Sequence, residues 1–356
     1  MDTGDTLVNY FTWISTYLTY GFSRTGFREG RTKGIPTIPL FPNVGHLNFS
    51  NRIRTFCLLS AFSICLPLLA QEQPTLPLTI KDSGIPRNVD QRKGTWCYQW
   101  GYNREAFTQS DINFRGPGYR FTLKEVVAKD KPEKFGTSYV DLGHFDIPQF
   151  SYRITRYMSD HFSISFGQDH MKYVMTRGQA SNIYGYISPL AIQRAQLHPS
   201  IESFPYLYYF PAQYKQYEGF HLGEPINITP DLLKFDHTDG LNYVALEAGF
   251  IQQIWMSDNG AHGLSITSAI GGGPMICKSD VRLFGEGKNN NFHISGYGIS
   301  ARVGLKLEFV RSFFFELVAR EGYADLSSIL TTGRSKDRAS QNFGFLEKSL
   351  YFGYTR

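Results

Sequence analysis

The sequence of 356 residues has little charge, few cysteines and no long apolar run, and these shortages exclude whole classes of protein. Charged residues make up only 19% of the chain and aromatic residues 15%, a composition that intrinsically disordered proteins do not have. No stretch of about 18 apolar residues occurs, which excludes a helical membrane protein. The formal net charge is +5 and falls to +2 without residues 1–70, which is too small for a nucleic-acid-binding surface, so we expect no nucleic-acid partner.

A secretion signal is predicted at residues 51–70. Arg52 and Arg54 form a basic flank, about 15 apolar residues follow, and Ala70 ends an imperfect small-residue cleavage site. A buried core helix is the alternative, but the basic flank and the polar residues after Ala70 favour a signal peptide. We expect residues 1–50 to be an extension of the gene model or disordered, and residues 71–93 to be a periplasmic tail.

Apolar and polar side chains alternate along most of the remaining sequence. Trp96, Tyr98 and Trp100 share one parity, which predicts a β-strand with one aromatic face. Ten such strands can be placed, at 95–103, 108–115, 118–128, 147–156, 161–175, 241–255, 263–273, 295–309, 313–325 and 342–355. An extra pair near 181–187 and 229–236 would make twelve, or would extend a hairpin above the membrane.

The register of two hairpins follows from keeping their apolar faces together. Pairing Phe309 with Phe313 leaves a three-residue turn and sets opposite charges against each other on the polar side. By the same reasoning, Ile154 pairs with Phe162 around a turn at 157–159.

The connections alternate in length. Short turns and long polar loops follow one another, the turns near 116–118, 157–159, 257–260 and 310–312 and the loops at 129–146, 177–240, 274–293 and 327–341. Such alternation is typical of short periplasmic turns and long extracellular loops. The sequence therefore predicts an all-β fold over 94–356, a transmembrane antiparallel β-barrel of 10–12 strands, with a periplasmic β-sandwich as the alternative. Cys97 and Cys277 would then lie about 25 Å apart and are predicted to be free thiols.

Several stretches of sequence carry a resemblance that spans roughly 94 to 355, namely WGYNREAFTQSDINFRG, YRFTLKEVVAKD, GQDHMKYVM, HTDGLNYV and EGYADL. The chain resembles Gram-negative outer-membrane β-barrel proteins and, more closely, an uncharacterised family of outer-membrane proteins. The resemblance implies a location in the outer membrane, contact with its lipid or lipopolysaccharide, and insertion by the barrel-assembly machinery, but it carries no activity. One departure is the last strand, which ends Phe352-Gly353-Tyr354-Thr355-Arg356 where such barrels have a terminal aromatic residue.

Polar residues that could carry chemistry gather at the predicted extracellular rim. Continuing the second hairpin register pairs Asp146 with His170, facing outward at the height of the lipid headgroups, and His237 and Asp239 lead into the next strand. A histidine oriented by a carboxylate can act as a general base for a hydroxyl nucleophile. These four are the candidate catalytic residues of a lipid-A or phospholipid acyl-ester hydrolase. The alternatives are a solvated polar rim, or Ca²⁺ bound by Asp236 and Asp239.

Charged residues on the polar parity would face the barrel interior: Arg153, Lys306, Glu308, Glu316 and Arg320. They predict an ion-pair network that fills a narrow barrel, with a selectivity constriction as the alternative. No zinc pattern, nucleophile elbow or dinucleotide fingerprint is present, so no cofactor is expected apart from the Ca²⁺ alternative. The sequence favours a non-enzymatic envelope protein that binds an extracellular ligand, glycan or lipopolysaccharide. A rim hydrolase and a narrow diffusion channel are the two alternatives.

Overall fold

The computed structural model describes residues 91–133, 136, 148–196, 215–309 and 312–356. The expectations for residues 1–50, for the signal peptide and for most of the periplasmic tail lie outside these ranges. In the part of the chain that is described, no helix is long and apolar enough to cross a membrane.

The described residues form a sheet of fourteen antiparallel strands and two short helices. The strands are β1 (Trp96–Phe107), β2 (Ser110–Gly116), β3 (Tyr119–Val126), β4 (Ala128–Asp130), β5 (Ser151–Tyr157), β6 (Phe162–Met175), β7 (Ala180–Ile187), β8 (Gly219–Asn227), β9 (Leu233–Met256), β10 (Gly263–Cys277), β11 (Asp280–Leu283), β12 (His293–Phe309), β13 (Phe313–Leu330) and β14 (Arg338–Thr355). The helices are α3 (Pro189–Gln196) and the 3-10 turn η3 (Lys215–Tyr217).

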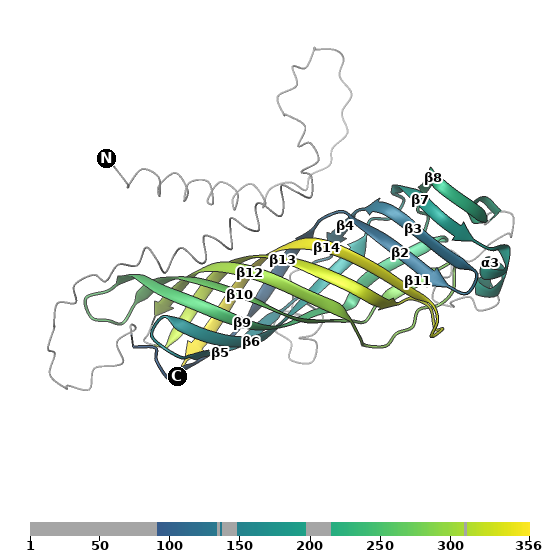
Figure 1. Ribbon diagram of the computed structural model, residues 1–356. Coiled ribbons are helices and arrows are strands. Elements are labelled where there is room, and N and C mark those ends of the chain that lie inside the picture. The colour runs from purple at the N-terminus through teal and green to yellow at the C-terminus, as the bar shows by residue number, and fades with distance from the viewer. Residues whose placement is uncertain (1–90, 134–135, 137–147, 197–214, 310–311) are drawn as a thin grey trace, which may run out of the picture. The chain divides into compact units, whose positions relative to one another are not determined.

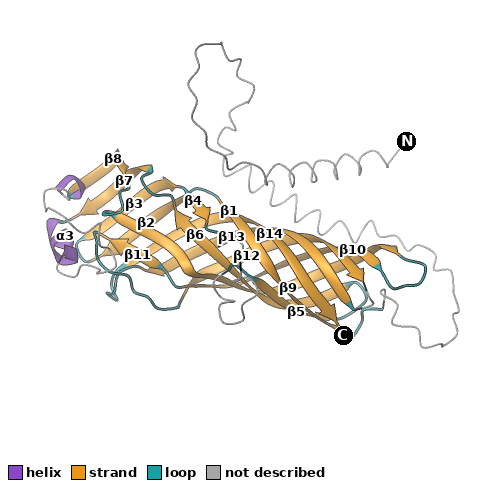
Figure 2. Cartoon of the chain, turned by 180° about the vertical axis from the view of Figure 1, so that it is seen from behind, coloured by secondary structure: helices purple, strands orange, loops and turns teal. Residues whose placement is uncertain are grey.

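Eight of these strands, β1, β5, β6, β9, β10, β12, β13 and β14, form a closed ring (Figure 1). Each pairs with the next, and β1 closes the ring by pairing with β14 from Cys97 opposite Thr355 to Phe107 opposite Phe345. The β5–β6 and β9–β10 turns, and the ends of β12 and β13 that meet at Phe309 and Phe313, lie at the end of the ring where the C-terminus is found (Figure 2). Closure leaves no exposed edge along the ring, as in barrels that span membranes.

The other six strands stand at the opposite end of the ring, as Figure 2 shows. The first part of β14 pairs with β2, and the sheet continues through β3 and β7 to β8, while β4 pairs with β6 and β11 with β9. We call β2, β3, β4, β7, β8 and β11, with the adjoining ends of β6, β9 and β14, the outer extension. Its interior is an apolar cluster that includes Phe114, Phe121, Tyr173, Phe235 and Leu283. The outer extension is therefore packed like a soluble domain.

In the ring the distribution of polar and apolar side chains is the reverse of that in the outer extension. Its exposed side chains include Trp100, Phe166, Leu246, Leu317 and Phe352, whereas its inward positions carry charge. A contiguous exposed surface of this kind is costly in water and matches lipid. The ring thus has a lipid-type wall and a polar interior.

The all-β antiparallel barrel predicted from the sequence is confirmed, but the number of strands differs from 10–12. The ring has eight strands and the complete sheet fourteen. The predicted hairpin at 108–128 corresponds to β2 and β3, which lie outside the ring because β1 pairs directly with β14. The alternation of apolar and polar residues does not distinguish the ring from the outer extension. The aromatic face of β3 is buried inside the outer extension, whereas that of β1 is exposed on the ring.

Residues 177–240, expected as one long loop, contain β7, α3, η3, β8 and the beginning of β9. The suggested strand at 181–187 is β7, but its partner is β8 rather than the segment at 229–236. This hairpin belongs to the outer extension, in agreement with the alternative that it lies above the ring.

The predicted pairing of Phe309 with Phe313 is confirmed. The pairing of Ile154 with Phe162 is wrong, because Ile154 lies opposite Phe166. The turn is longer than predicted, and the Met158 N–H donates to the Phe162 carbonyl at 2.9 Å. Cys97 and Cys277 are both free thiols, as predicted, and both are buried.

Candidate functional site

His170 has the outward parity of Phe166 on β6, as predicted, but its side chain is buried against neighbouring residues rather than exposed at the rim. The corrected hairpin register places it across from Phe150, whose carbonyl accepts its backbone N–H at 2.8 Å and whose ring stacks on the imidazole with centroids 5.3 Å apart. Its Nδ1 lies 2.9 Å from Asn242 Oδ1, and the side chain is buried. Asp146, its predicted partner, lies outside the described residues. The predicted pairing of Asp146 with His170 is wrong, because Phe150 lies opposite His170.

His237 lies in the apolar interior of the outer extension. Tyr173 and Phe235 surround its ring, and its Nδ1 lies 2.8 Å from Ser279 Oγ. Burial lowers the pKa of His237 to about 3, so the imidazole is neutral at physiological pH. Asp239 is not its partner, because that carboxylate accepts a hydrogen bond from Thr238 and forms an ion pair with Lys288 at 3.6 Å.

Ser279 is the hydroxyl that sequence reasoning missed. It is 42 residues from His237 in the chain and reaches it only because β11 pairs with the start of β9. No local motif signals this contact. The pair has a nucleophile and a base at hydrogen-bond distance, but both side chains are buried. Chemistry at this pair would require the outer extension to open.

The carboxylates considered for Ca²⁺ are engaged by cations. Asp236 lies 3.4 Å from Arg177 and 3.8 Å from Lys234, and Asp239 pairs with Lys288. Within the described ranges, no group of three or more His, Cys, Asp and Glu side chains could hold a metal ion.

The centre of the ring contains a dense ion-pair network. Arg153 binds Asp169 at 2.7 Å and Glu247 at 3.2 Å. Arg320 also binds both carboxylates, with Glu247 at 2.9 Å, and reaches Glu347 at 3.8 Å. Asp169 and Glu247 are thus each shared between these two guanidinium groups, and all five side chains are buried. A buried charge persists only when it is paired in this way.

A second cluster continues toward the short turns. Lys306 lies 3.4 Å from Glu308, which also binds Arg92 at 2.6 Å. Glu316 accepts a hydrogen bond from Thr267 at 2.5 Å and lies 3.6 Å from Arg302. Arg302 also binds Glu247 at 3.0 Å, which connects Glu316 to the first cluster, and Lys306 lines the same small cavity as Arg302 and Glu316. We call the two adjacent clusters together the lumen network.

The five residues predicted for the lumen all lie in this network. Sequence reasoning missed Arg92, Asp169, Glu247, Arg302 and Glu347, which complete it. Parity along the strands could have found the last four, since each falls on the inward face of a predicted strand. Parity does not identify which charges meet.

The network leaves little free space in this part of the ring. A cavity of about 20 Å³ is lined by residues including Gln99, Thr155, Tyr157, Lys306 and Glu316. That volume holds about one water molecule. Side chains therefore fill most of the lumen around this cavity.

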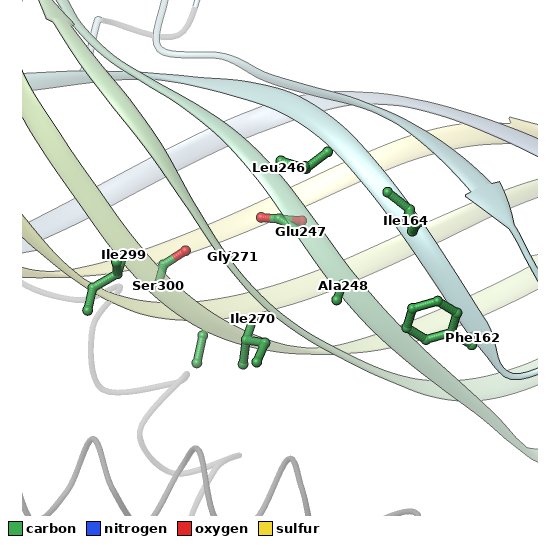
Figure 3. Close-up of a pocket in the computed structure, with 10 residues that line it drawn as sticks. Phe162, Ile164, Leu246, Glu247, Ala248, Ile270, Gly271, Ile299 and Ser300 are labelled. Carbon is green, nitrogen blue, oxygen red and sulfur yellow. The ribbon is translucent and has the colours of Figure 1, made fainter.

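A larger hollow of about 600 Å³ lies on the outward wall of the ring (Figure 3). Ile164 and Leu246 border it on β6 and β9, and Ile270 and Ile299 on β10 and β12. Glu247 also lines it, but its carboxylate is turned into the lumen network. The exposed lining is apolar, so the hollow suits hydrocarbon rather than a polar substrate.

The ring is closed, its outward wall is apolar, and its interior is charged and filled by side chains. These three features define an antiparallel β-barrel of the kind that spans membranes. Among solved structures, the chain is similar to outer membrane protein OprG from Pseudomonas aeruginosa, with 6% identity, coverage of 76% of this chain and 99% of that one, and a TM-score of 0.35. It is also similar to Ail, the attachment invasion locus protein of Yersinia pestis, at 11% identity, 74% and 99% coverage and a TM-score of 0.24. A third is the outer membrane protease OmpT from Escherichia coli, at 8% identity, 80% and 99% coverage and a TM-score of 0.27. No protein-family model and no curated protein matches the sequence.

Proposed function

We propose that this protein is an integral outer-membrane barrel of a Gram-negative envelope that does not conduct solutes and that binds a ligand through its outer extension. The single observation that supports this proposal is the filled lumen. Side chains from six of the ring strands meet there, namely Arg153 of β5, Asp169 of β6, Glu247 of β9, Arg302 of β12, Arg320 of β13 and Glu347 of β14. In this proposal the chain reaches the membrane through a signal peptide and the barrel-assembly machinery.

Opening this lumen would be costly. A pore would require buried guanidinium and carboxylate groups to separate, and removing one partner of a buried ion pair costs about 3–5 kcal/mol. The network contains several such pairs that share partners, so they would have to break together. We therefore favour a structural role for the lumen charges over a selectivity constriction.

Planar-bilayer recording tests the proposal. Heat-modifiable gel migration first establishes that the reconstituted protein is folded, and a water-filled porin serves as the positive control. We expect no stable conductance steps from this protein. Reproducible unit steps at a protein density that gives steps for the porin would contradict the proposal and favour the diffusion channel.

An acyl-ester hydrolase is the second candidate, and the contact of His237 with Ser279 is the observation that favours it. Lipid mass spectrometry of membranes with and without the protein tests this candidate. Ser279→Ala and His237→Ala probe the pair, His170→Ala probes the other predicted base, and Ser257→Ala in the β9–β10 turn is the matched control. An unchanged acyl pattern supports the non-enzymatic proposal. An acyl chain lost with the wild type and kept with Ser279→Ala and His237→Ala would establish the hydrolase.

A Ca²⁺ ion at Asp236 and Asp239 would have to compete with Lys234, Arg177 and Lys288 for the carboxylates. Calorimetric titration with calcium chloride tests that site directly. We give it less weight than saccharide or lipid contact.

A further inference from the structure

One row of outward side chains crosses five adjacent strands of the outer extension. In strand order it contains Arg338 of β14, Arg115 of β2, Arg120 of β3, Tyr186 of β7 and Phe220 of β8. Each member lies directly opposite the next in the register of the sheet. All alternate with buried neighbours and so point away from the apolar interior. We call this set the arginine–aromatic row.

Three of its members are positively charged and directly adjacent. Arg115 and Arg120 are exposed, and among the residues that the structure describes neither side chain has a hydrogen-bond or ion-pair partner. Nearby carboxylates are engaged elsewhere, since Asp111 pairs with Lys124 and buried Asp337 binds Thr332 and Arg194. Like charges directly opposite one another destabilise a sheet. An anion placed over the row would remove that repulsion and could bind two guanidinium groups at once.

The other end of the row is aromatic. The rings of Tyr186 and Phe220 lie 4.6 Å apart. The next row of the same face adds Tyr184 opposite Leu222. Phe220 is 81% exposed and Leu222 88% exposed, which is unusual for such residues in water. Exposed aromatic side chains beside cationic ones suit a ligand with both apolar ring faces and anionic groups.

The row also stands well beyond the lipid-type wall. On β14 the outward apolar side chains begin at Leu346, and Arg338 precedes it by eight residues. At about 3.4 Å per residue this is ~27 Å along the strand, or ~20 Å along the membrane normal at a tilt of about 40°. At that height the surroundings of an outer-membrane barrel are the sugars of lipopolysaccharide rather than the lipid headgroups.

We propose that the arginine–aromatic row binds the phosphate-bearing core saccharide of lipopolysaccharide in the same membrane. This inference rests on the proposed function, which places the outer extension at the cell surface. Guanidinium groups bind phosphate oxygens in pairs, and the aromatic side chains contact sugar ring faces. A shallow and exposed site binds weakly, but a ligand anchored in the same leaflet is present at high effective concentration. Bound phosphate would then remove the repulsion between the adjacent arginine side chains for as long as the protein is in the membrane.

The test uses the full-length protein in phosphatidylcholine nanodiscs and a fluorescently labelled, delipidated core oligosaccharide that retains its phosphates. Arg115→Gln with Arg120→Gln removes two charges from the row. Lys93→Gln with Lys129→Gln removes two charges from exposed positions elsewhere and is the matched control. We expect the first pair to weaken binding by about tenfold or more and the control pair by less than about twofold. The wild type should bind dephosphorylated oligosaccharide more weakly by a similar factor. Phe220→Ala, which leaves the charges of the row in place, should also weaken binding of the phosphorylated oligosaccharide.

Other results would overturn the proposal. Equal losses from the two double variants would mean that net charge alone drives binding. Binding of dextran sulfate, but not of the core oligosaccharide, would assign the row to a polyanion from another source. Arg115→Lys with Arg120→Lys, which keeps the charge, should fold as the wild type and retain part of the affinity. A folded, non-conducting protein that binds no oligosaccharide would refute this inference alone, whereas conductance steps would refute the proposed function.

Discussion

Glu286, in the segment between β11 and β12, is a buried carboxylate whose charge costs the outer extension stability. It lies 2.8 Å from Arg334. Burial raises its pKa to about 7 although Arg334 and Arg194 lower it. In the unfolded chain the same group has a pKa of about 4.3. Between these values the folded state binds more protons than the unfolded state, so the contribution of Glu286 to stability decreases as the pH rises.

Replacing Glu286 by Gln should therefore flatten the pH dependence of stability. We expect the urea concentration at the midpoint of unfolding to decrease for the wild type as the pH is raised from about 4.5 to about 7. For Glu286→Gln it should decrease less over the same pH range. Tryptophan fluorescence in micelles is the measurement. Glu125→Gln, at an exposed position of β3, is the control and should leave the slope as it is. Identical slopes for Glu286→Gln and the wild type would show that another group titrates in this window.

At the residue scale, the parity of side chains along the strands predicted which charged residues face the lumen, but it did not predict which of them form ion pairs with one another. Arg153 and Arg320 fall on the inward face from sequence alone, but the sharing of Asp169 between them depends on the ring closing. The partner of His170 was wrongly predicted because the apolar faces of the β5–β6 hairpin match equally well in two registers that differ in turn length. The observed pairing of Ile154 with Phe166 places Phe150 opposite His170.

Whole strands were easier to predict than their environments. Nearly every predicted strand coincides with an observed one, because a period of two is a property of the sequence. The period of two does not show which face of a strand contacts lipid. β3 and β1 alternate alike, yet Phe121 is buried in the outer extension while Trp100 is exposed on the ring. The missing information is the identity of the neighbouring strand, which comes from pairings distant in the sequence, such as β1 with β14.

The two environments predict two cooperative units. Phe121 stacks on Phe114 with ring centroids 5.0 Å apart and is 2% exposed. Phe121→Ala should destabilise the outer extension by about 3–5 kcal/mol. Hydrogen exchange followed by mass spectrometry should then show lost protection in β2, β3 and β7, with the ring strands unchanged.

Phe315→Ala is the matched control, because Phe315 lies on the outward wall of the ring. It should leave exchange in the outer extension as in the wild type. A uniform loss of protection across ring and extension in Phe121→Ala would mean that the barrel unfolds as a single unit.

At the scale of the whole molecule, the ring separates the outer extension from the short turns, and these two ends should face opposite sides of the membrane. Arg115→Cys lies in the extension and Met158→Cys in the β5–β6 turn, and both positions are exposed. The described native cysteines are buried. A membrane-impermeant maleimide should label Arg115→Cys in intact cells, and Met158→Cys only after permeabilisation. The reverse pattern would invert the orientation, and the unsubstituted protein gives the background.

The reversal of polarity along β14 has a consequence for the bilayer. Phe343 and Phe345 are buried inside, whereas from Leu346 to Tyr354 the apolar side chains face outward. Those eight steps cover ~27 Å of strand, or ~20 Å of membrane normal at a tilt of about 40°. Lys348 is also outward, near the upper limit, where its charged end can extend to the headgroups. Along β14 this height is shorter than the hydrocarbon layer of most bilayers, so hydrophobic mismatch should thin the lipid beside this strand, and short-chain phosphatidylcholine should match it better than long-chain phosphatidylcholine.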